Sequence, residues 1–225
     1  MGDIKKETSL KRNIHKKRDL PPATLLSPVP VVLVSCKGEK TSPNALAIAW
    51  TGTICSDPPM AYISVRPTRY SHALILETKE FVINLVNEEL IHACDYCGVK
   101  SGEKEDKMQS AKLTPVEIKT MKYAPAILES PLSIACRVDQ VIHAGSHDIF
   151  MAKITHITGD EYYFDNNGKL CLEKAKLVSY AHGDYYAIGK KLGFFGFSVA
   201  SPKAYKRRMD KNIHKKTNQN KKENK

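Results

Sequence analysis

The chain has 225 residues, of which 42% are apolar, and this length suffices for one domain with a sizeable core but falls short of two full domains. Its longest apolar stretches are far below the roughly 20 residues that a membrane-spanning helix needs. We therefore expect a soluble protein without membrane contact, and only the formal charge of +11 raises the question of a nucleic-acid partner.

The positive charge lies at the two ends of the chain. Residues 1–19 hold seven Lys or Arg against three acidic residues, and residues 203–225 hold ten against two, so residues 20–202 are nearly neutral. Both ends lack apolar periodicity, and such compositions cannot bury enough surface to offset chain entropy. We expect disordered basic tails at 1–19 and 203–225 around a single domain at 20–202, and a nucleic-acid partner is disfavoured.

The N-terminus and the six cysteines bear on location and metal binding. No apolar segment precedes Leu20, so a secretion signal is not supported, and we expect a cytoplasmic protein with reduced thiols. Cys94 and Cys97 form a C-x-x-C pair, but no second pair completes four zinc ligands. His92 is an available third ligand; we favour the alternative, a helix with two half-buried thiols, and predict no metal site.

Apolar and β-branched runs predict a chain dominated by strands. Strands are expected over 31–35, 44–54, 61–65, 81–86, 132–142, 148–157 and 162–164, and short helices over 72–78 and 88–96. The pair 132–142 and 148–157 is expected to be antiparallel and joined near Gly145, and 162–164 to enter a tight turn at 165–168. Short strands at this spacing favour a mainly β fold, an antiparallel barrel that is closed or partly open.

The segment from Ser64 to His72 carries the residues expected of an anion site. Its two arginines, Arg66 and Arg69, accompany three Ser or Thr side chains at a strand end just before a helix. Guanidinium groups, hydroxyls and free backbone N–H groups together suit a phosphate dianion. The alternative is a solvated basic loop whose serine caps the helix. Neither a G-x-G-x-x-G nor a G-x-x-x-x-G-K-[ST] motif occurs.

The upstream run from Asn44 to Thr53 alternates small residues with hydrogen-bonding ones. A flat ring such as an isoalloxazine needs backbone and hydroxyl groups along its polar edge and close approach of backbone to its face, and Gly52 with its two flanking threonines suits this. Trp50 is more consistent with packing in the core than with contact to such a ring.

Read together, several segments resemble the flavin reductase-like family of FMN-binding split barrels, particularly its flavoredoxin-type members. The resemblance spans roughly residues 24–198 and rests on residues 44–53, 55–60, 64–72, 81–84, 97–102, 106–108, 124–125, 129–131 and 145–148. It implies an antiparallel FMN-binding split β-barrel that holds FMN non-covalently at the interface of a homodimer.

The resemblance also implies site residues. The FMN phosphate would lie near the Ser64–Ser71 segment, the ring along 44–53, and Lys100, Ser101 and Lys107 close to the flavin. His147 matches a position near the nicotinamide or flavin face and is the candidate catalytic residue, although Ala152-Lys153-Ile154 replaces the family's usual Gly-Glu-Val. The cofactor-binding residues so implied are Asn44, Ala45, Trp50, Thr51, Gly52, Thr53, Ser64, Val65, Arg66, Arg69, Tyr70, Ser71, Lys100, Ser101 and Lys107.

The function implied is that of a flavin reductase-type oxidoreductase, which takes electrons from NAD(P)H through bound FMN to a second acceptor. Three alternatives stay open: a flavoredoxin-like electron carrier reduced by a partner protein, a pyridoxamine-phosphate-oxidase-like enzyme on a related barrel, and a flavin-binding module without turnover. The carrier is the nearest of these, because basic tails could recruit an acidic redox partner.

Overall fold

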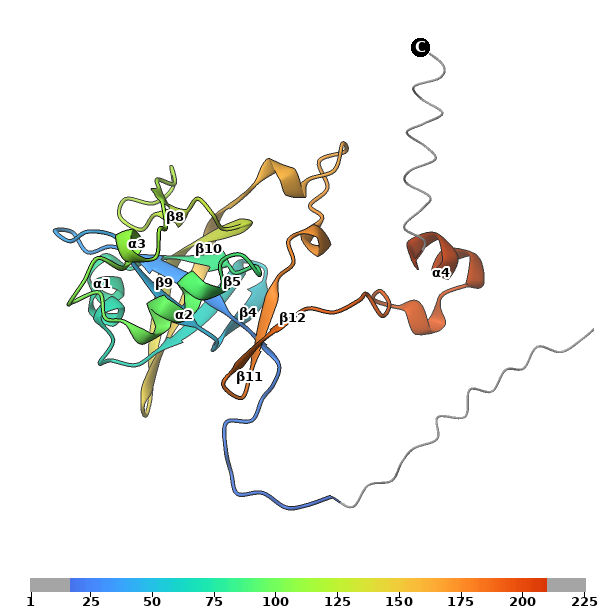
Figure 1. Cartoon of the computed structure of the whole chain (residues 1–225), viewed down its shortest axis with the longest axis horizontal. Coiled ribbons are helices and arrows are strands. Elements are labelled where there is room, and N and C mark those ends of the chain that lie inside the picture. The colour runs from blue at the N-terminus through green and yellow to red at the C-terminus, as the bar shows by residue number, and fades with distance from the viewer. Residues whose placement is uncertain (1–16, 210–225) are drawn as a thin grey trace, which may run out of the picture.

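The computed structural model describes residues 17–209, which form mostly antiparallel strands with a few short helices (Figure 1). The main sheet has seven strands. In spatial order these are β3 (Asn44–Ile48), β2 (Val32–Cys36), β6 (Glu80–Leu85), β9 (Leu132–Ala144), β10 (His147–Gly159), β5 (Pro59–Val65) and β4 (Thr51–Ser56). Every neighbouring pair in this sheet is antiparallel.

The two edges of this sheet belong to consecutive strands, joined only by Ala49 and Trp50. In a flat sheet, six spacings between strands would amount to about 29 Å, whereas three Cα steps span at most about 11 Å. The sheet therefore curls until its edges meet. We call this junction, residues 48–51, the seam. The covalent chain closes the barrel there, because β3 and β4 form no hydrogen-bonded ladder with each other. Ser64 N donates across it to the carbonyl oxygen of Trp50, at 2.9 Å.

Smaller elements surround the barrel. A three-stranded sheet contains β1 (Val29–Pro30), β11 (Val178–Ala181) and β12 (Asp184–Ala187), and a two-stranded one contains β7 (Pro115–Val116) and β8 (Ala126–Ile127). The helices are α1 (Tyr70–Thr78), α2 (Ile91–Val99), α3 (Lys107–Ser110) and α4 (Pro202–Met209), with single 3₁₀ turns η1 (Glu161–Tyr163), η2 (Leu172–Lys174) and η3 (Phe197–Val199). None of the described helices is long and apolar enough to cross a membrane.

Strand β2 shows how the sequence divides the core into two layers. Val32, Val34 and Cys36 pack into the barrel interior with residues of α1, whereas Leu33 packs into the layer under α2. Successive side chains of a strand point to opposite faces, so a strand covered on both sides becomes a continuous apolar run. All five β2 residues are accordingly buried.

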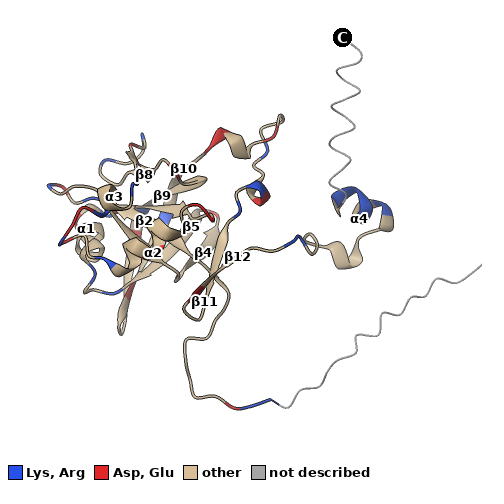
Figure 2. Cartoon of the chain, viewed as in Figure 1, with Lys and Arg blue, Asp and Glu red and all other residues tan. Residues whose placement is uncertain are grey.

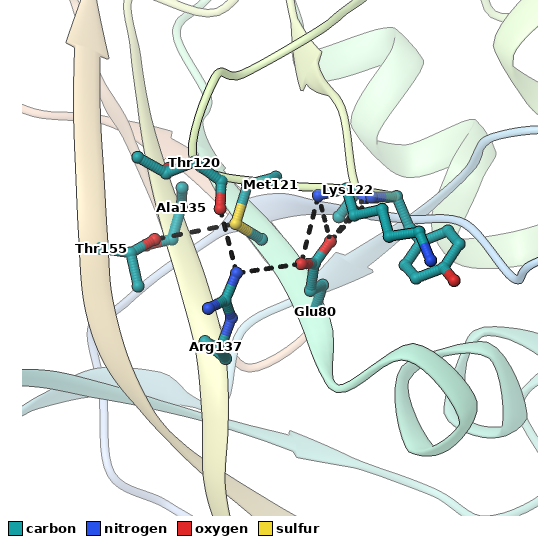
Figure 3. A network of polar contacts seen from close by, with 9 residues as sticks. Glu80, Thr120, Met121, Lys122, Ala135, Arg137 and Thr155 are labelled. Atoms are coloured by element: carbon teal, nitrogen blue, oxygen red, sulfur yellow. Dashed lines mark hydrogen bonds and ion pairs between the residues drawn. The ribbon is translucent and has the colours of Figure 1, made fainter.

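A buried carboxylate anchors the loop ahead of β8 (Figure 3). Glu80, at the start of β6, is 4% exposed and accepts hydrogen bonds of 2.8–3.3 Å from the backbone N–H groups of Lys122, Tyr123 and Ala124. Arg137 Nη2 lies 3.3 Å from Glu80 Oε1 and donates to the carbonyl oxygen of Thr120, at 3.0 Å. The Glu80 side chain thus provides acceptors for the backbone N–H groups of a turn that forms no regular secondary structure.

The predicted antiparallel β-barrel is confirmed, and the hairpin β9–β10 turns at Gly145, whose φ is +67°. Two predicted elements are wrong. The single strand expected over 44–54 bends at the seam and forms β3 and β4. Residues 162–164 belong largely to η1 instead of a strand, although the turn at 165–168 is present, with Gly168 N donating to Asp165 O at 2.9 Å.

The basic C-terminal segment is partly described. Residues 203–209, predicted to be disordered, lie in helix α4, which carries Lys206, Arg207 and Arg208 and stands apart from the barrel (Figure 2). Phe194 packs near Tyr205 and under the Arg208 guanidinium, and these side chains give the helix its contacts. Residues 1–16 and 210–225 of the predicted tails lie outside the described residues.

Candidate functional site

Two neighbouring cavities lie beside the seam and share Leu46, Arg66 and Arg69 in their walls. The smaller one, of about 490 Å³, is lined by Arg66, residues 68–71, 100–102 and 107 together with Leu46, and we call it the cationic pocket. The larger one, of about 610 Å³, is lined by residues 46–50 at the seam, 64–66 at the end of β5, His147, and parts of the segments 24–31, 95–99 and 180–185; we call it the seam groove.

The cationic pocket gathers four basic side chains. Arg69 Nη1 donates to the carbonyl oxygen of Gly98 at 3.2 Å, and Lys107 Nζ donates to that of Cys97 at 3.0 Å. Both carbonyls belong to the last turn of α2, where unpaired carbonyls favour cations. Arg66 and Lys100 are exposed and make no side-chain hydrogen bond within the described part of the chain. The pocket therefore has unpaired positive charge.

Hydrogen-bonding groups complete the cationic pocket. Asn44 Nδ2 donates to the hydroxyl of Ser71 at 2.7 Å, while Asn44 Oδ1 is buried and has no partner among residues 17–209. Gly102 lies so close above it that a Cβ there would come within 2.2 Å of Asn44 Oδ1. Helix α1 begins beside the pocket, and the first N–H groups of a helix have no intrahelical acceptor.

The alternative interpretation of Ser71 as a helix cap is wrong. The N-cap residue of α1 is Arg69, and no side chain caps that end of the helix. Ser71 instead lies inside α1, is 1% exposed and belongs to the wall of the cationic pocket.

Trp50 and His147 pack against each other in the wall of the seam groove. Their ring centroids are 4.6 Å apart at 44°. Trp50 is 41% exposed, so its expected packing in the core is wrong: the bend between β3 and β4 turns the side chain outward. Desolvation, with the nearby charge of Arg66, lowers the pKa of His147. The imidazole is therefore neutral at pH 7.

A second histidine cluster fixes the hairpin that carries His147. The buried Asp148 carboxylate lies 2.7 Å from His72 Nε2 of α1 and 2.8 Å from His143 Nδ1 of β9. These hydrogen bonds lower the pKa of Asp148, which keeps its charge. The start of β10 is thereby tied to α1, the helix that begins at the cationic pocket.

Some predicted residues do not line either cavity. Asn44 and Ala45 lie beneath the wall, at 3% and 0% exposure. Thr51, Gly52 and Thr53 lie on the edge strand β4, where Thr51 Oγ1 donates to the carbonyl oxygen of Tyr62 at 2.6 Å. The other ten predicted cofactor-binding residues line one or both cavities: Trp50, Ser64, Val65, Arg66, Arg69, Tyr70, Ser71, Lys100, Ser101 and Lys107.

Several wall residues have no signal in the sequence. The β11–β12 hairpin contributes Tyr180, His182 and Tyr185 to the seam groove, and the N-terminal segment contributes Leu25 and Leu26. Both segments lie far in sequence from the recognisable motifs. Gly183, which takes a φ of +98° between the two strands, is a sequence signal for a turn and does not indicate a site.

The cysteine pair belongs to the core. Cys94 and Cys97 are buried on one face of α2, and burial raises their pKa to about 12 and about 11. Among the described residues no group of three or more His, Cys, Asp or Glu side chains could hold a metal ion. In residues 17–209 the C-x-x-C pair is therefore part of the packing under β2 and β3.

Comparisons with known proteins agree with this geometry. A family model described as "Flavin reductase like domain" matches residues 25–189. A flavoredoxin of Desulfovibrio vulgaris (Miyazaki F) is 32% identical, covers 82% of this chain and 100% of its own, and superposes with a TM-score of 0.76. A flavoredoxin from Methanosarcina acetivorans is 26% identical, with coverages of 83% and 100% and a TM-score of 0.75.

A more distant structure, an FMN-binding protein from Thermus thermophilus, is 20% identical, with coverages of 80% and 99% and a TM-score of 0.67, and its likeness shows the fold. The family match extends over most of the described barrel and includes both cavity walls contributed by β3, β5 and α1. The chain thus belongs to the flavin reductase-like domain family, with a split-barrel fold.

Proposed function

We propose that this chain binds FMN non-covalently and serves as a flavin reductase-type oxidoreductase, which takes electrons from NAD(P)H and delivers them to a second acceptor. The observation that carries the proposal is that a pocket with unpaired positive charge shares three wall residues with a groove beside a strand edge that has no ladder partner among the described residues. When bound, FMN supplies the electron-transfer chemistry, accepting electrons from the donor and releasing them to the acceptor.

The cationic pocket fits the phosphate of FMN. Arg66 and Arg69 offer guanidinium donors, Lys100 and Lys107 offer ammonium groups, and Ser71 offers a hydroxyl beside the start of α1. A dianion would receive charge-assisted hydrogen bonds there, and the buried Asn44 holds Ser71 in place. The size and charge of this pocket support FMN over riboflavin.

The seam groove fits the flavin ring. Strand β3 pairs with β2 on one side only, so the backbone groups of its other edge, near Ala47 and Ile48, are free to hydrogen-bond a polar ring edge. Trp50 and neutral His147 offer flat surfaces on the rim. The groove is open to solvent on that side, which leaves room for a donor or acceptor to approach.

A flavoredoxin-like carrier is the second candidate. It is favoured by the 32% identity with a flavoredoxin over the whole of that protein. A carrier would hold FMN in the same place but receive electrons from a protein partner. The structure of one chain supports both, because the open rim admits either a nicotinamide or a protein surface.

We further propose that two copies form a homodimer in the cytoplasm. The open seam groove leaves one side of a flat cofactor uncovered by its own chain, and a partner copy would enclose it. The cysteines of the described chain are all free thiols, which is consistent with a reducing compartment.

Binding and reduction experiments test the proposal. The purified chain should bind FMN, and anaerobic NADH or NADPH should bleach the flavin band. Arg66→Ala and Arg69→Ala should each weaken FMN binding by about 1.5–3 kcal/mol, roughly 10- to 150-fold, because each removes a charge-assisted contact. Lys119→Ala, an exposed cation outside both cavities, is the matched control.

Three results would contradict parts of the proposal. Unchanged FMN affinity in both arginine variants would remove the phosphate assignment. Bound FMN that stays oxidised with either nicotinamide but is promptly reduced by dithionite would favour the carrier. A chain that keeps its fold but binds no FMN would overturn the proposal as a whole.

A further inference from the structure

Lys107 differs from the other cations of the pocket because it is buried. It is 2% exposed, whereas Arg66, Arg69 and Lys100 are exposed. A buried ammonium needs hydrogen-bond acceptors and a counter-charge to offset its lost hydration. Lys107 Nζ has one acceptor, the carbonyl oxygen of Cys97 at 3.0 Å, and no carboxylate of the described residues forms an ion pair with it.

The thiols around Lys107 do not supply that counter-charge. Cys97 of α2 and Cys36 of β2 both face it. Burial raises the pKa of Cys97 to about 11 and that of Cys36 to about 12, so both are neutral at physiological pH. Two polarisable but uncharged groups therefore line the ammonium on these sides.

The charged neighbours do not supply it either. Arg69, just ahead of α1, has the same sign as Lys107, and Arg66 and Lys100 add further positive charge to the pocket. Glu105, in the loop before α3, acts on Lys107 only at longer range, and its carboxylate accepts hydrogen bonds from Tyr96 and Ser110. No carboxylate of the described residues is thus in direct contact with Lys107.

We propose that Lys107 takes up a proton when a phosphate dianion enters the cationic pocket, so that binding of a phosphate-bearing flavin is coupled to protonation of this side chain. The inference rests on the proposed function and adds a pH dependence to it. In the empty pocket, burial without a carboxylate in contact disfavours the ammonium form. The arriving dianion supplies the missing counter-charge, and the proton comes from solvent to Nζ.

The direction in which FMN affinity changes with pH follows from the direction of the Lys107 pKa shift. Burial lowers the pKa of Lys107 from its ordinary 10.5 in the empty pocket, and a bound dianion raises it again. FMN affinity is therefore full below the pKa of the empty pocket and falls as pH rises toward the pKa of the complex, by up to about tenfold per pH unit for one proton. Below about pH 6 the phosphate itself takes up a proton, so measurements start above that value.

Calorimetry measures the proton directly. FMN is titrated into the full chain at about pH 8.5, between the pKa of phosphate and that of an ordinary lysine, in two buffers with different ionisation enthalpies. The difference in heat gives the number of protons taken up, which should be a measurable fraction of one proton per FMN bound. Lys107→Arg, which stays charged at every accessible pH, should bind FMN with no uptake and with an affinity that is flat from about pH 7 to 10.

Two controls separate Lys107 from its neighbours. Lys100→Met removes an exposed cation of the same pocket and should weaken FMN binding while keeping the proton uptake. Riboflavin, which lacks the phosphate, should bind without uptake. Should Lys107→Arg fail to fold, Lys107→Met provides the same test, since it has no proton to gain.

The outcomes are distinct. FMN binding without proton uptake in the unaltered chain would overturn the inference and leave the proposed function standing. Uptake that persists in Lys107→Arg or Lys107→Met would assign the proton to another group and would also overturn it. A folded chain that binds no FMN would refute the proposed function, and the inference with it.

Discussion

The carboxylate of Glu80 offers a sharp test of how the barrel holds its loops. In Glu80→Gln, the side chain keeps its shape but loses its charge and one acceptor oxygen. Oε2 accepts from the backbone of Lys122, Tyr123 and Ala124, and Oε1 accepts from Lys122 and from Arg137 Nη2 (Figure 3). The new amide can retain only one of these two sets of partners.

The expected destabilisation is that of the amide orientation that loses fewer hydrogen bonds. If the amide nitrogen replaces Oε1, Lys122 N keeps its 3.0 Å bond to the remaining oxygen, whereas Arg137 Nη2 loses its carboxylate acceptor and faces another donor. The backbone N–H groups of Lys122, Tyr123 and Ala124 then donate to a neutral oxygen instead of a charged one. A hydrogen bond to a charged group contributes about 1.5–3 kcal/mol and an unpaired buried donor costs about 1–3 kcal/mol. We expect a loss of about 2–4 kcal/mol, and at about 2–4 °C per kcal/mol the melting temperature should fall by about 4–16 °C.

Thermal and urea unfolding of the variant measure this loss. Arg137→Gln is the matched control, because it removes the ion pair while leaving the backbone donors paired with Glu80. Its side chain is 55% exposed, so the expected cost is within about 1 kcal/mol. If Glu80→Gln costs no more than Arg137→Gln, then the backbone contacts of Glu80 do not stabilise the loop and the reasoning fails.

Further predictions concern assembly, the chain ends and acid stability. Sedimentation should show a homodimer whose dissociation releases flavin, and a flavin-loaded monomer at micromolar concentration would contradict this. Deleting residues 1–19 and 203–225 should leave the melting temperature and flavin content unchanged, because the described residues of these segments, 17–19 and 203–209, belong to no core cluster; loss of flavin would show that an end covers the site. The stability that the Asp148 carboxylate contributes should be full above its ordinary pKa of 3.8 and be lost as pH falls through its lower pKa in the folded protein. Asp148→Asn should therefore lose less stability than the unaltered chain on acidification. An acid unfolding transition that is the same in both would refute this.

The sequence predicts the strands well wherever a β-branched run is bounded by a turn. The hairpin β9–β10 is an example, because Gly145 marks its turn and two long runs rich in apolar and β-branched residues flank it. The sequence also predicts an anion site on the segment from Ser64 to His72, and five residues of that segment line the cationic pocket, since a strand end followed by a helix start keeps neighbours in sequence close in space. These features depend on local chemistry.

The sequence does not predict features that depend on contacts between segments far apart in the chain. Nothing between Asn44 and Ile54 marks the bend, because its cause is the closure of the barrel and the pairing of Ser64 N with Trp50 O. The exposure of Trp50 follows from the same bend. Likewise the seam groove takes part of its wall from the β11–β12 hairpin, which folds back across more than 100 residues of sequence.

The seam also affects how the chain would behave without a bound ligand. Strand β3 presents an edge whose N–H and C=O groups have no ladder partner among the described residues. Such an edge is a template on which another chain can add a strand, and proteins normally cover or disrupt it. A ligand seated along Ala47 and Ile48 would occupy those groups, so the empty chain is the form most prone to edge-to-edge association, and early loading would protect newly made protein from aggregation.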